Sequence, residues 1–334
     1  MPFLEDALNP DRAQAALRTV MPEVRRVMAA RLMRHKPGKR ALIAYELETA
    51  AGSETVLGKI RAKGLDDRSY QLQRALWQHG WDAHSTSGFS VPEPLGIIPM
   101  WHLWLQRWVP GSPATASLTA ADGVALAARI AALAHHLHQT PMPTAKPHTL
   151  ADELRILRDR VPQAAVIFPA LSPRIRRILA ACEALAHDWA TVLHAQPTGT
   201  WFSPVGIHRD FYGDQVIVMG DRLWLLDLDL YCQGHPALDM GNFIAHITEF
   251  SLREWGDPAA LVDREAALTE AAIALWQPNL AISPQVLTQA IEGFVTLTLV
   301  RHIHISTRIV ARRSQTAAIV ALCERRLAPW LASG

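Results

Sequence analysis

The sequence predicts an α+β fold of two lobes, a small β-rich lobe followed by a larger and mostly helical one. The first third of the chain alternates short apolar runs with turn residues, whereas the remainder shows long helical periodicity. A Pro-Gly-Ser-Pro segment at residues 110–113 is the clearest linker signal. With 334 residues, 49% of them hydrophobic, the chain can bury one large core or two modest ones. We expect an N-terminal lobe over residues 1–110 and a C-terminal lobe over residues 111–334.

A Pro-Gly turn organises the N-terminal region. Pro37 and Gly38 suit the central positions of a type II turn, in which proline presets one φ and glycine accepts a positive one. The apolar pattern before the turn fits a strand or a helix, and the turn favours a β-hairpin. A third strand carries Lys59. The other elements expected here are a helix at about residues 10–17, a helix at about residues 66–79 that Gly80 ends, and strands within residues 90–99 and 102–109.

Helices dominate the rest of the chain, and one strand pair interrupts them. The strands are expected within residues 215–219 and 222–230, joined by a Gly220-Asp221 turn of the kind favoured in hairpins. The helices are expected at about residues 120–139, 150–160 and 172–194, and then from near Pro236, Pro258, Pro284 and Ser314.

Composition excludes several classes of function. The formal net charge of +2 comes from 33 basic and 31 acidic residues in mixed order, so there is no basic stripe for nucleic acid. Arg or His interrupts the longest apolar stretches, and the N-terminal residues are polar and acidic, so neither membrane insertion nor export is expected. Three widely spaced cysteines show no metal-ligand spacing. These features predict a reduced, cytoplasmic protein without nucleic-acid or membrane partners.

The stretch "GIHRDFYGDQVIV" carries residues suited to phosphoryl transfer. Such a transfer needs a carboxylate for the attacking hydroxyl, oxygen ligands for Mg²⁺ and a cation on the phosphates. Asp210 lies in a loop from which its carboxylate can project. Gln215 follows on the same loop, just before a strand. Asp227 ends the second strand of the pair, and antiparallel pairing is expected to return it next to Gln215.

Two further charged residues accompany this stretch. Asp229 would share a face with Asp227 if the strand persists, although both carboxylates could instead be solvated at the end of a strand. Lys59 lies between Leu57 and Ile60 and is costly to bury unless an anion meets it. A lysine on an edge strand is also a common guard against aggregation, so that alternative stays open for Lys59.

These segments resemble the aminoglycoside phosphotransferase and choline kinase-like family, a branch of the protein-kinase-like fold. "HRDFYGDQ" is similar to the family's H-G-D loop that ends in asparagine, and "LLDLDLYCQGHPALDMGNF" is similar to its metal motif, with His235 in place of an aspartate. Elsewhere "KPGKRALIAYEL", "VLGKI", "LWLQRWVPGSP" and "ALAHHLH" are similar to its hairpin, lysine strand, hinge and Leu-His helix. The resemblance implies a two-lobed protein-kinase-like fold.

The resemblance also implies roles for individual residues. Asp210 would be the catalytic base, Gln215 and Asp227 the Mg²⁺ ligands, and Lys59 the contact to the α- and β-phosphates. His208 and Asp239 would brace the loop, and His138 fits the Leu-His position. The adenine would be held by backbone groups of the hinge, around Gln106, Arg107, Trp108 and Val109.

Besides His235, the chain departs from the family pattern at three places. Arg209 replaces a glycine, and Gln215 replaces an asparagine and adds a methylene to the metal ligand. The helix after the lysine strand has no glutamate to pair with Lys59. Its candidates for that position are Ser69, Gln71 and Gln73, with Asp66 or Asp67 at the start of the helix.

The expected activity is that of a small-molecule kinase. It would transfer the γ-phosphoryl group of ATP or GTP, as the co-substrate with Mg²⁺, to a hydroxyl of a metabolite or an aminoglycoside-like substrate. One alternative is a kinase-like protein that binds a nucleotide or metabolite without turnover. A weaker one is a protein kinase, against which the chain has no D-F-G segment and no room for an activation loop. The acidic candidates for gripping an amine on the acceptor are Glu249, Glu254, Asp257 and Asp263.

Overall fold

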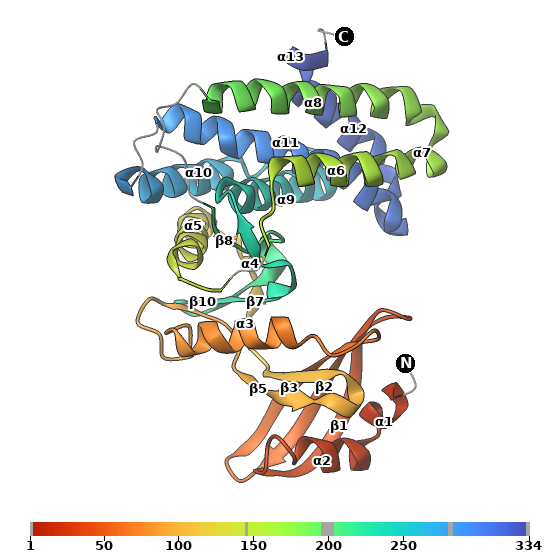
Figure 1. The fold of residues 1–334 in the computed structure, drawn as a ribbon, viewed down its shortest axis with the longest axis vertical. Coiled ribbons are helices and arrows are strands. Elements are labelled where there is room, and N and C mark those ends of the chain that lie inside the picture. The colour runs from red at the N-terminus through yellow and green to blue at the C-terminus, as the bar shows by residue number, and fades with distance from the viewer. Residues whose placement is uncertain (1–2, 144–145, 195–203, 280–282, 332–334) are drawn as a thin grey trace. The chain divides into compact units, whose positions relative to one another are not determined.

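The computed structural model describes residues 3–143, 146–194, 204–279 and 283–331 (Figure 1). The chain divides into two compact units. Unit 1 consists of Met1–Ser112 and Ile217–Asp229, and unit 2 consists of Pro113–Val216 and Leu230–Gly334. The predicted α+β class is confirmed, with a β-sheet region at the N-terminus and a helical region at the C-terminus.

A five-stranded sheet forms the centre of unit 1. Its order is β1-β2-β3-β6-β5, and each printed pair of neighbours is antiparallel. The predicted hairpin is confirmed: Gly38 has a φ of 67°, and the Lys39 N–H donates to the Lys36 carbonyl at 3.0 Å. The strands of this sheet are β1 (Val24–Lys36), β2 (Arg40–Thr49), β3 (Gly52–Arg61), β5 (Pro94–Ile98) and β6 (Leu103–Arg107).

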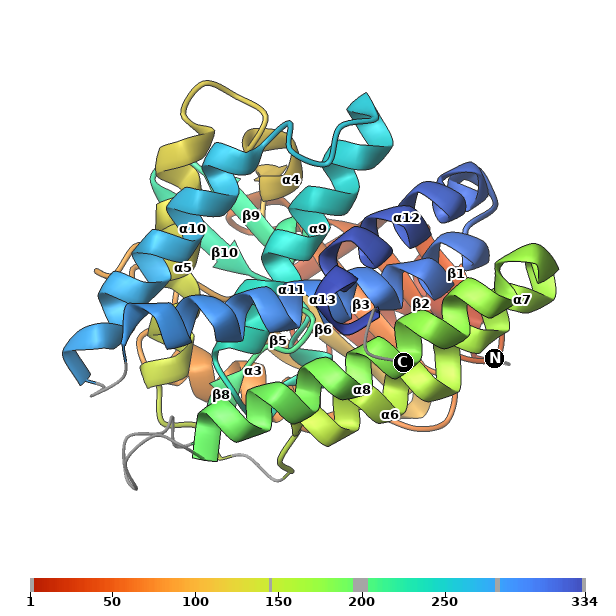
Figure 2. The ribbon, with the colours of Figure 1, turned by 90° about the horizontal axis from the view of Figure 1, so that it is seen from above.

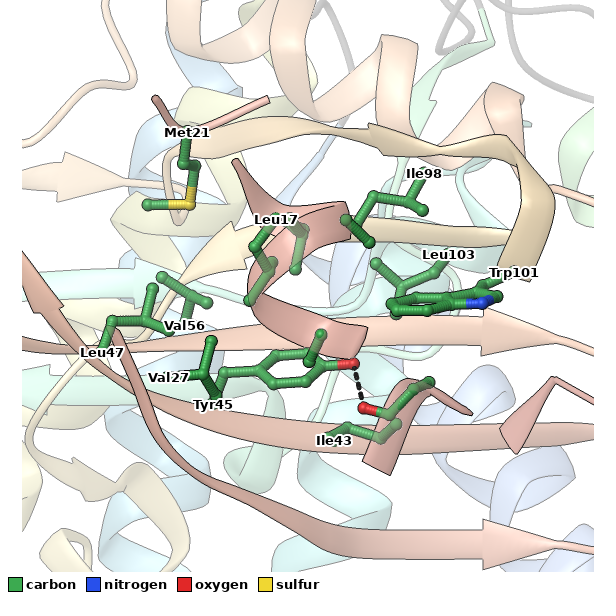
Figure 3. Packing of buried hydrophobic residues seen from close by; sticks show 14 of the residues in the cluster. Leu17, Met21, Val27, Ile43, Tyr45, Leu47, Val56, Ile98, Trp101 and Leu103 are labelled. Atoms are coloured by element: carbon green, nitrogen blue, oxygen red, sulfur yellow. Dashed lines mark hydrogen bonds between the residues drawn. The ribbon is translucent and has the colours of Figure 1, made fainter. Parts of the chain in front are cut away.

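Two short helices cover one face of this sheet, α1 (Leu4–Leu8) and α2 (Pro10–Leu17). Buried residues alternate along β2 because successive side chains of a strand point to opposite faces. Figure 3 shows Tyr45 in this core, where its hydroxyl donates to the Ala7 carbonyl of α1 at 3.0 Å. The same alternation along β3 buries Val56 and Ile60, and it places Lys59 on the face away from this core.

The remaining elements of unit 1 are helix α3 (Asp67–Gln78), which packs against β5, and strands of a second sheet. Helix α3 begins at Asp66, whose side chain accepts from the Ser69 N–H at 3.3 Å, and Gly80 follows its end with a φ of 83°. Strand β4 (Phe89–Ser90) pairs in parallel with β10 (Arg222–Leu225), and β10 lies beside β9 (Val216–Met219). The Gly220-Asp221 turn that joins β9 and β10 is present, with a φ of 56° at Gly220.

Unit 2 is a helical assembly. Helix α11 packs against α9, and α10 packs against α5 (Figure 2). A two-stranded ladder of β8 (Val205–Ile207) and β11 (Cys232–Gly234) adds to them. The longer helices are α5 (Gly123–Gln139), α6 (Leu150–Arg160), α8 (Ser172–His194), α9 (Ala237–Trp255), α10 (Val262–Trp276), α11 (Pro284–Arg308) and α12 (Thr316–Arg326).

The helices expected at residues 150–160 and 172–194 are confirmed as α6 and α8. A capping box at Thr149 and Asp152 fixes the start of α6. The helix expected from near Pro258 begins later, at Val262. Among the described residues, the cysteines are buried and form no disulfide, and no helix has the length and apolar character that a membrane span requires.

Candidate active site

The loop that carries Asp210 follows β8 in unit 2, and one carboxylate fixes its start. Asp239, in the first turn of α9, is fully buried. Its Oδ2 accepts from the backbone N–H of His208 at 2.9 Å and faces Nε2 of His138 at 3.0 Å, while its Oδ1 accepts from the N–H of Arg209 at 2.7 Å. His208 and Asp239, which the family resemblance assigned to support, are therefore in direct contact, and His138 of the Leu-His position joins them.

The backbone on both sides of Asp210 is held. Arg209 has a φ of 69°, a left-handed conformation that favours glycine, which is the residue of the family pattern at this position. On the other side, Nδ2 of Asn242 in α9 donates to the Phe211 carbonyl at 2.9 Å. Asp210 itself is partly exposed. A rigid backbone with an accessible carboxylate suits a residue that must orient a substrate hydroxyl.

Gln215 ends the same loop. It closes a short 3₁₀ turn, and its N–H donates to the Tyr212 carbonyl at 2.9 Å. Two residues earlier, Gly213 packs so closely on the backbone of Thr115 that a Cβ would lie 2.7 Å from the Thr115 nitrogen. The side chain of Gln215 is buried, which limits the positions that its amide oxygen can take.

A pocket in unit 1 gathers charged side chains of both signs. It lies on the sheet face opposite the α1–α2 core, beside the segment that follows β10. The side chains that line it are Arg34, Arg40, Ala41, Leu42, Lys59, Ile60, Arg61, Trp104, Asp227 and Asp229. Four cations thus surround two carboxylates. Such a pocket can accept an anion that brings its own divalent cation.

Lys59 belongs to this pocket, and its strand is not an edge strand. Strand β3 lies between β2 and β6, with Lys59 opposite Leu42 on one side and Trp104 on the other. The Nζ of Lys59 lies 4.6 Å from the ring centroid of Trp104, a cation–π contact. The explanation of Lys59 as an edge-strand guard is therefore wrong.

Asp227 and Asp229 also face this pocket, but not from a strand. The prediction that the second strand runs through Asp227 to Asp229 is wrong: β10 ends at Leu225, Asp227 has a φ of 54°, and Asp229 lies in a 3₁₀ turn. The left-handed residue turns the chain out of the sheet, so the two carboxylates are not placed by strand alternation.

The surroundings of Asp229 explain the direction in which its pKa is shifted. Burial and the nearby charge of Asp227 raise the pKa of Asp229, and Lys59 and Arg61 oppose that rise. Arg61 also forms an ion pair with Asp229, and Arg40 lies 3.7 Å from it. A divalent cation would relieve the repulsion between the two carboxylates, so the donors present fit Mg²⁺.

The helix that lacks a glutamate directs its side chains elsewhere. Gln73 of α3 is buried and donates to the Pro92 carbonyl at 2.7 Å and to Oε1 of Gln106 at 3.3 Å. Asp66, at the start of the helix, lies 3.0 Å from Arg61. Arg61 therefore links this helix start to Asp229, a role that the sequence did not suggest. Its position two residues after Lys59, on the same face of β3, was the available clue.

The hinge after β6 has two of its backbone donors occupied. The N–H of Arg107 donates to the Glu93 carbonyl at 2.9 Å, and the N–H of Trp108 donates to the Thr55 carbonyl at 3.1 Å. The Trp108 side chain is 42% exposed. Within the described parts of the chain, no backbone hydrogen bond involves the N–H of Val109. Of the four predicted hinge residues, Val109 therefore offers the clearest donor for a base.

The described residues contain no group of three or more His, Cys, Asp and Glu side chains arranged to hold a metal. Of the histidines of α5, His138 contacts the buried carboxylate of Asp239.

Comparison with known proteins agrees with these features. In the solved structures, a choline/ethanolamine kinase family protein from Mesorhizobium loti is similar, with a TM-score of 0.56 and 13% identity over 97% of this chain and 99% of that one. A spectinomycin phosphotransferase bound to AMP is also similar, with a TM-score of 0.60 and 12% identity over 94% of this chain and 98% of that one. An amicoumacin kinase with AMP-PNP and Ca²⁺ has a TM-score of 0.57 and 12% identity over 94% of this chain and 93% of that one.

At such identities, the likeness establishes the fold, which is that of the small-molecule kinases. The family model described as "Phosphotransferase enzyme family" matches residues 38–278, more than half of the chain. The chain belongs to this phosphotransferase family. No curated protein sequence matches it.

Proposed function

We propose that this protein is a small-molecule kinase that transfers the γ-phosphoryl group of ATP or GTP to a hydroxyl of a small acceptor. The observation that carries the proposal is the unit 1 pocket, in which Lys59 and three arginines surround Asp227 and Asp229. Four cations with two carboxylates suit a polyphosphate and its metal ion. The complexes of the similar kinases with AMP and AMP-PNP support a nucleotide as the ligand.

In the proposed reaction, Asp210 orients the acceptor hydroxyl and accepts its proton. The hydroxyl oxygen bonds to the γ-phosphorus as the bond from that phosphorus to the β–γ bridging oxygen breaks, and the nucleoside diphosphate leaves with the electron pair. Lys59 offsets the charge of the α- and β-phosphates. Mg²⁺, when bound, supplies positive charge to the phosphate oxygens, and Asp227 and Gln215 would be its protein ligands. Catalysis is thus positioning and electrostatics.

We propose that residues 1–110 form the nucleotide-binding lobe and residues 111–334 the lobe of the catalytic loop and the acceptor. The division of the chain after Ser112 supports this assignment. Gln106, Arg107, Trp108 and Val109 would then hold the base. Of these, Val109 is the expected donor, because the N–H groups of Arg107 and Trp108 are engaged in unit 1.

The test starts with binding of Mg·ATP and Mg·GTP, measured by calorimetry. Lys59→Met should weaken binding at least tenfold, because a charged contact to phosphate is worth about 1.5–3 kcal/mol. Lys63→Met is the matched control, since Lys63 is exposed and lies outside the pocket. If the nucleotides do not bind, or if the two variants behave alike, the assignment of the pocket is wrong.

Nucleotide consumption is then measured against a panel of hydroxyl-bearing acceptors. Asp210→Asn should lower kcat by about 10²–10⁴-fold, the usual contribution of a general base, while nucleotide binding is unchanged. Asp214→Asn is the control on the same loop, where Asp214 is exposed and accepts only from the Thr115 hydroxyl at 2.7 Å. Tight nucleotide binding without turnover on any acceptor would instead support a binding protein, the alternative motivated by Gln215 and the missing helix glutamate.

A further inference from the structure

A polar cluster in unit 2 adjoins the Asp210 loop. Asn242 of α9, which holds the Phe211 carbonyl, also accepts a hydrogen bond from Arg301 of α11. The ring of Tyr212 stacks on His246 of α9, with centroids 4.4 Å apart and planes inclined by 19°. The cluster therefore contacts Phe211 and Tyr212, the two residues that follow Asp210 in the loop. An acceptor in contact with Asp210 would lie close to this cluster.

Two arginines are the accessible charges of the cluster. The Arg301 side chain is 18% exposed, and its nearest carboxylate oxygen, on Glu153, lies 3.6 Å away. The Arg312 side chain is 31% exposed and lies 3.8 Å from Glu249, beyond hydrogen-bonding distance. Arg312 is therefore ion-paired with Glu249, but no hydrogen bond of its guanidinium is found within the described residues. The planar guanidinium could still donate hydrogen bonds to an anionic ligand.

The two carboxylates of the cluster, Glu153 and Glu249, already have charged partners within the protein. Glu153 is buried and lies 2.6 Å from Nε2 of His148; burial would raise its pKa, but His148 and Arg301 hold that pKa below its ordinary value. Glu249 is also buried, and Arg253, Arg312 and His302 lie within 4.0 Å of it. Both carboxylates are thus paired with cations of the protein.

The other acidic residues suggested for gripping an amine are not free either. Glu254 pairs with Arg253, and Asp263 pairs with Arg264. Asp257 is exposed and accepts from the Ala259 N–H at 2.9 Å. Each of the four predicted acidic candidates therefore already has an ion-pair or hydrogen-bond partner in the protein.

Two neutral histidines complete the cluster. The Nε2 atoms of His246 and His302 lie 3.3 Å apart. Burial and the nearby Arg301 and Arg312 lower the pKa of His246, and the same causes with Arg253 lower the pKa of His302 to about 3. Neither imidazole carries charge at neutral pH, so the positive charge next to them comes from Arg301 and Arg312. These two guanidinium groups can attract an anion.

We propose that the acceptor of the phosphoryl group carries an anionic group, a carboxylate or a phosphate, that Arg301 and Arg312 bind beside Tyr212 and His246. This inference rests on the proposed function, and it specifies the substrate class of that function as hydroxy acids or phosphorylated polyols. The acceptor's anion pairs with the guanidinium donors, and its hydroxyl reaches Asp210, where phosphoryl transfer proceeds as above.

The test uses the full chain and acceptors in matched pairs. Glycerate and glycerol 3-phosphate are compared with neutral glycerol, and the cationic arm is ethanolamine and spectinomycin. Activity is measured as kcat/KM with Mg·ATP, and the phosphate ester is identified by mass spectrometry. We expect kcat/KM for an anionic acceptor to exceed that for glycerol by at least tenfold. The more active anionic arm identifies the group as carboxylate or phosphate. A preference for ethanolamine or spectinomycin would overturn the inference while leaving the kinase activity established.

Arg312→Gln provides the second test. It should lower kcat/KM for the anionic acceptor about tenfold, or about 1.4 kcal/mol, and leave that for glycerol unchanged. Arg312→Lys should lie between, because it keeps the charge but loses the planar donors. Arg308→Gln, at an exposed position near the end of α11, is the control. An equal loss on charged and neutral acceptors in Arg312→Gln would refute the charge contact.

Binding of glycerate and of inorganic phosphate without nucleotide separates the two proposals. Wild type should bind one of these probes, and Arg312→Gln should bind it about tenfold more weakly. Binding of this kind without any nucleotide consumption would support the anion site and refute the kinase. Nucleotide consumption without any anion binding would support the kinase and refute the anion site.

Discussion

Asp239→Asn is the sharpest test of how the loop is built. An asparagine can keep its carbonyl oxygen where Oδ2 accepts from His208 N–H and faces His138, but its NH₂ group then faces the Arg209 N–H that Oδ1 accepted at 2.7 Å. One hydrogen bond to a charged group is lost, worth about 1.5–3 kcal/mol, and a buried N–H is left without its acceptor, which costs about 1–3 kcal/mol. We expect a loss of about 3 kcal/mol in the free energy of unfolding.

Equilibrium urea unfolding, followed by far-ultraviolet circular dichroism, measures this loss. Asp214→Asn, on the same loop but exposed, should change stability by less than about 0.5 kcal/mol. The Asp239 variant should also lower kcat for every acceptor alike, because it loosens the backbone next to Asp210. A destabilisation below about 1 kcal/mol would show that these contacts do not hold the loop, and the reasoning would fail.

Three more predictions concern the backbone and the buried histidines. In urea unfolding, the Arg209→Gly variant should be about 1 kcal/mol more stable than Arg209→Ala. Both variants remove the side chain, but only glycine adopts a φ of 69° without strain; equal stabilities would count against backbone strain. In the folded protein the His302 side chain stays neutral, whereas in the unfolded chain it gains a proton below about pH 6.5. Lowering the pH from about 7 to about 5 therefore favours unfolding and reduces the free energy of unfolding by about 2 kcal/mol. In the His302→Gln variant, the loss of stability between about pH 7 and about pH 5 should be smaller by about 2 kcal/mol. The control variant His84→Gln, at an exposed position, should show the same pH dependence as the wild type, and an unchanged pH dependence in His302→Gln would contradict the prediction. Gly111→Ala should lower the melting temperature, since a Cβ there would collide with the Val218 carbonyl oxygen and the φ of 137° suits only glycine; an unchanged melting temperature would exclude that collision.

Local patterns were sufficient to predict most of the elements. The turn at Pro37 and Gly38 selected strand over helix for the residues before it, because the turn's dihedral angles suit a hairpin. The periodicity of α6 and α8 gave their bounds as the structure has them. The family resemblance implied that His208 and Asp239 support the loop, and the Asp239 carboxylate does accept from the N–H groups of His208 and Arg209.

Other features needed the tertiary structure, because sequence spacing carries no information about sheet order or about the partner of a charge. Lys59 could have been an edge residue until β3 was found between β2 and β6. Asp229 was expected on a strand, but the positive φ of Asp227 ends the extended chain before it. Arg61 appeared an ordinary strand charge until Asp229, far along the chain, was found paired with it.

The sequence by itself determined the elements and the family of this protein, and it predicted the residues of the catalytic loop. Those follow from short-range periodicity, turn geometry and motif spacing, which are all local properties of the chain. Only the tertiary structure decided which charges are free. It paired Glu249 and Glu254 with Arg253. It also placed Arg312 in an ion pair with Glu249, without a hydrogen bond of its guanidinium among the described residues. The electrostatics of a site depend on distances between residues far apart in sequence, and the chain fixes those distances only when it folds.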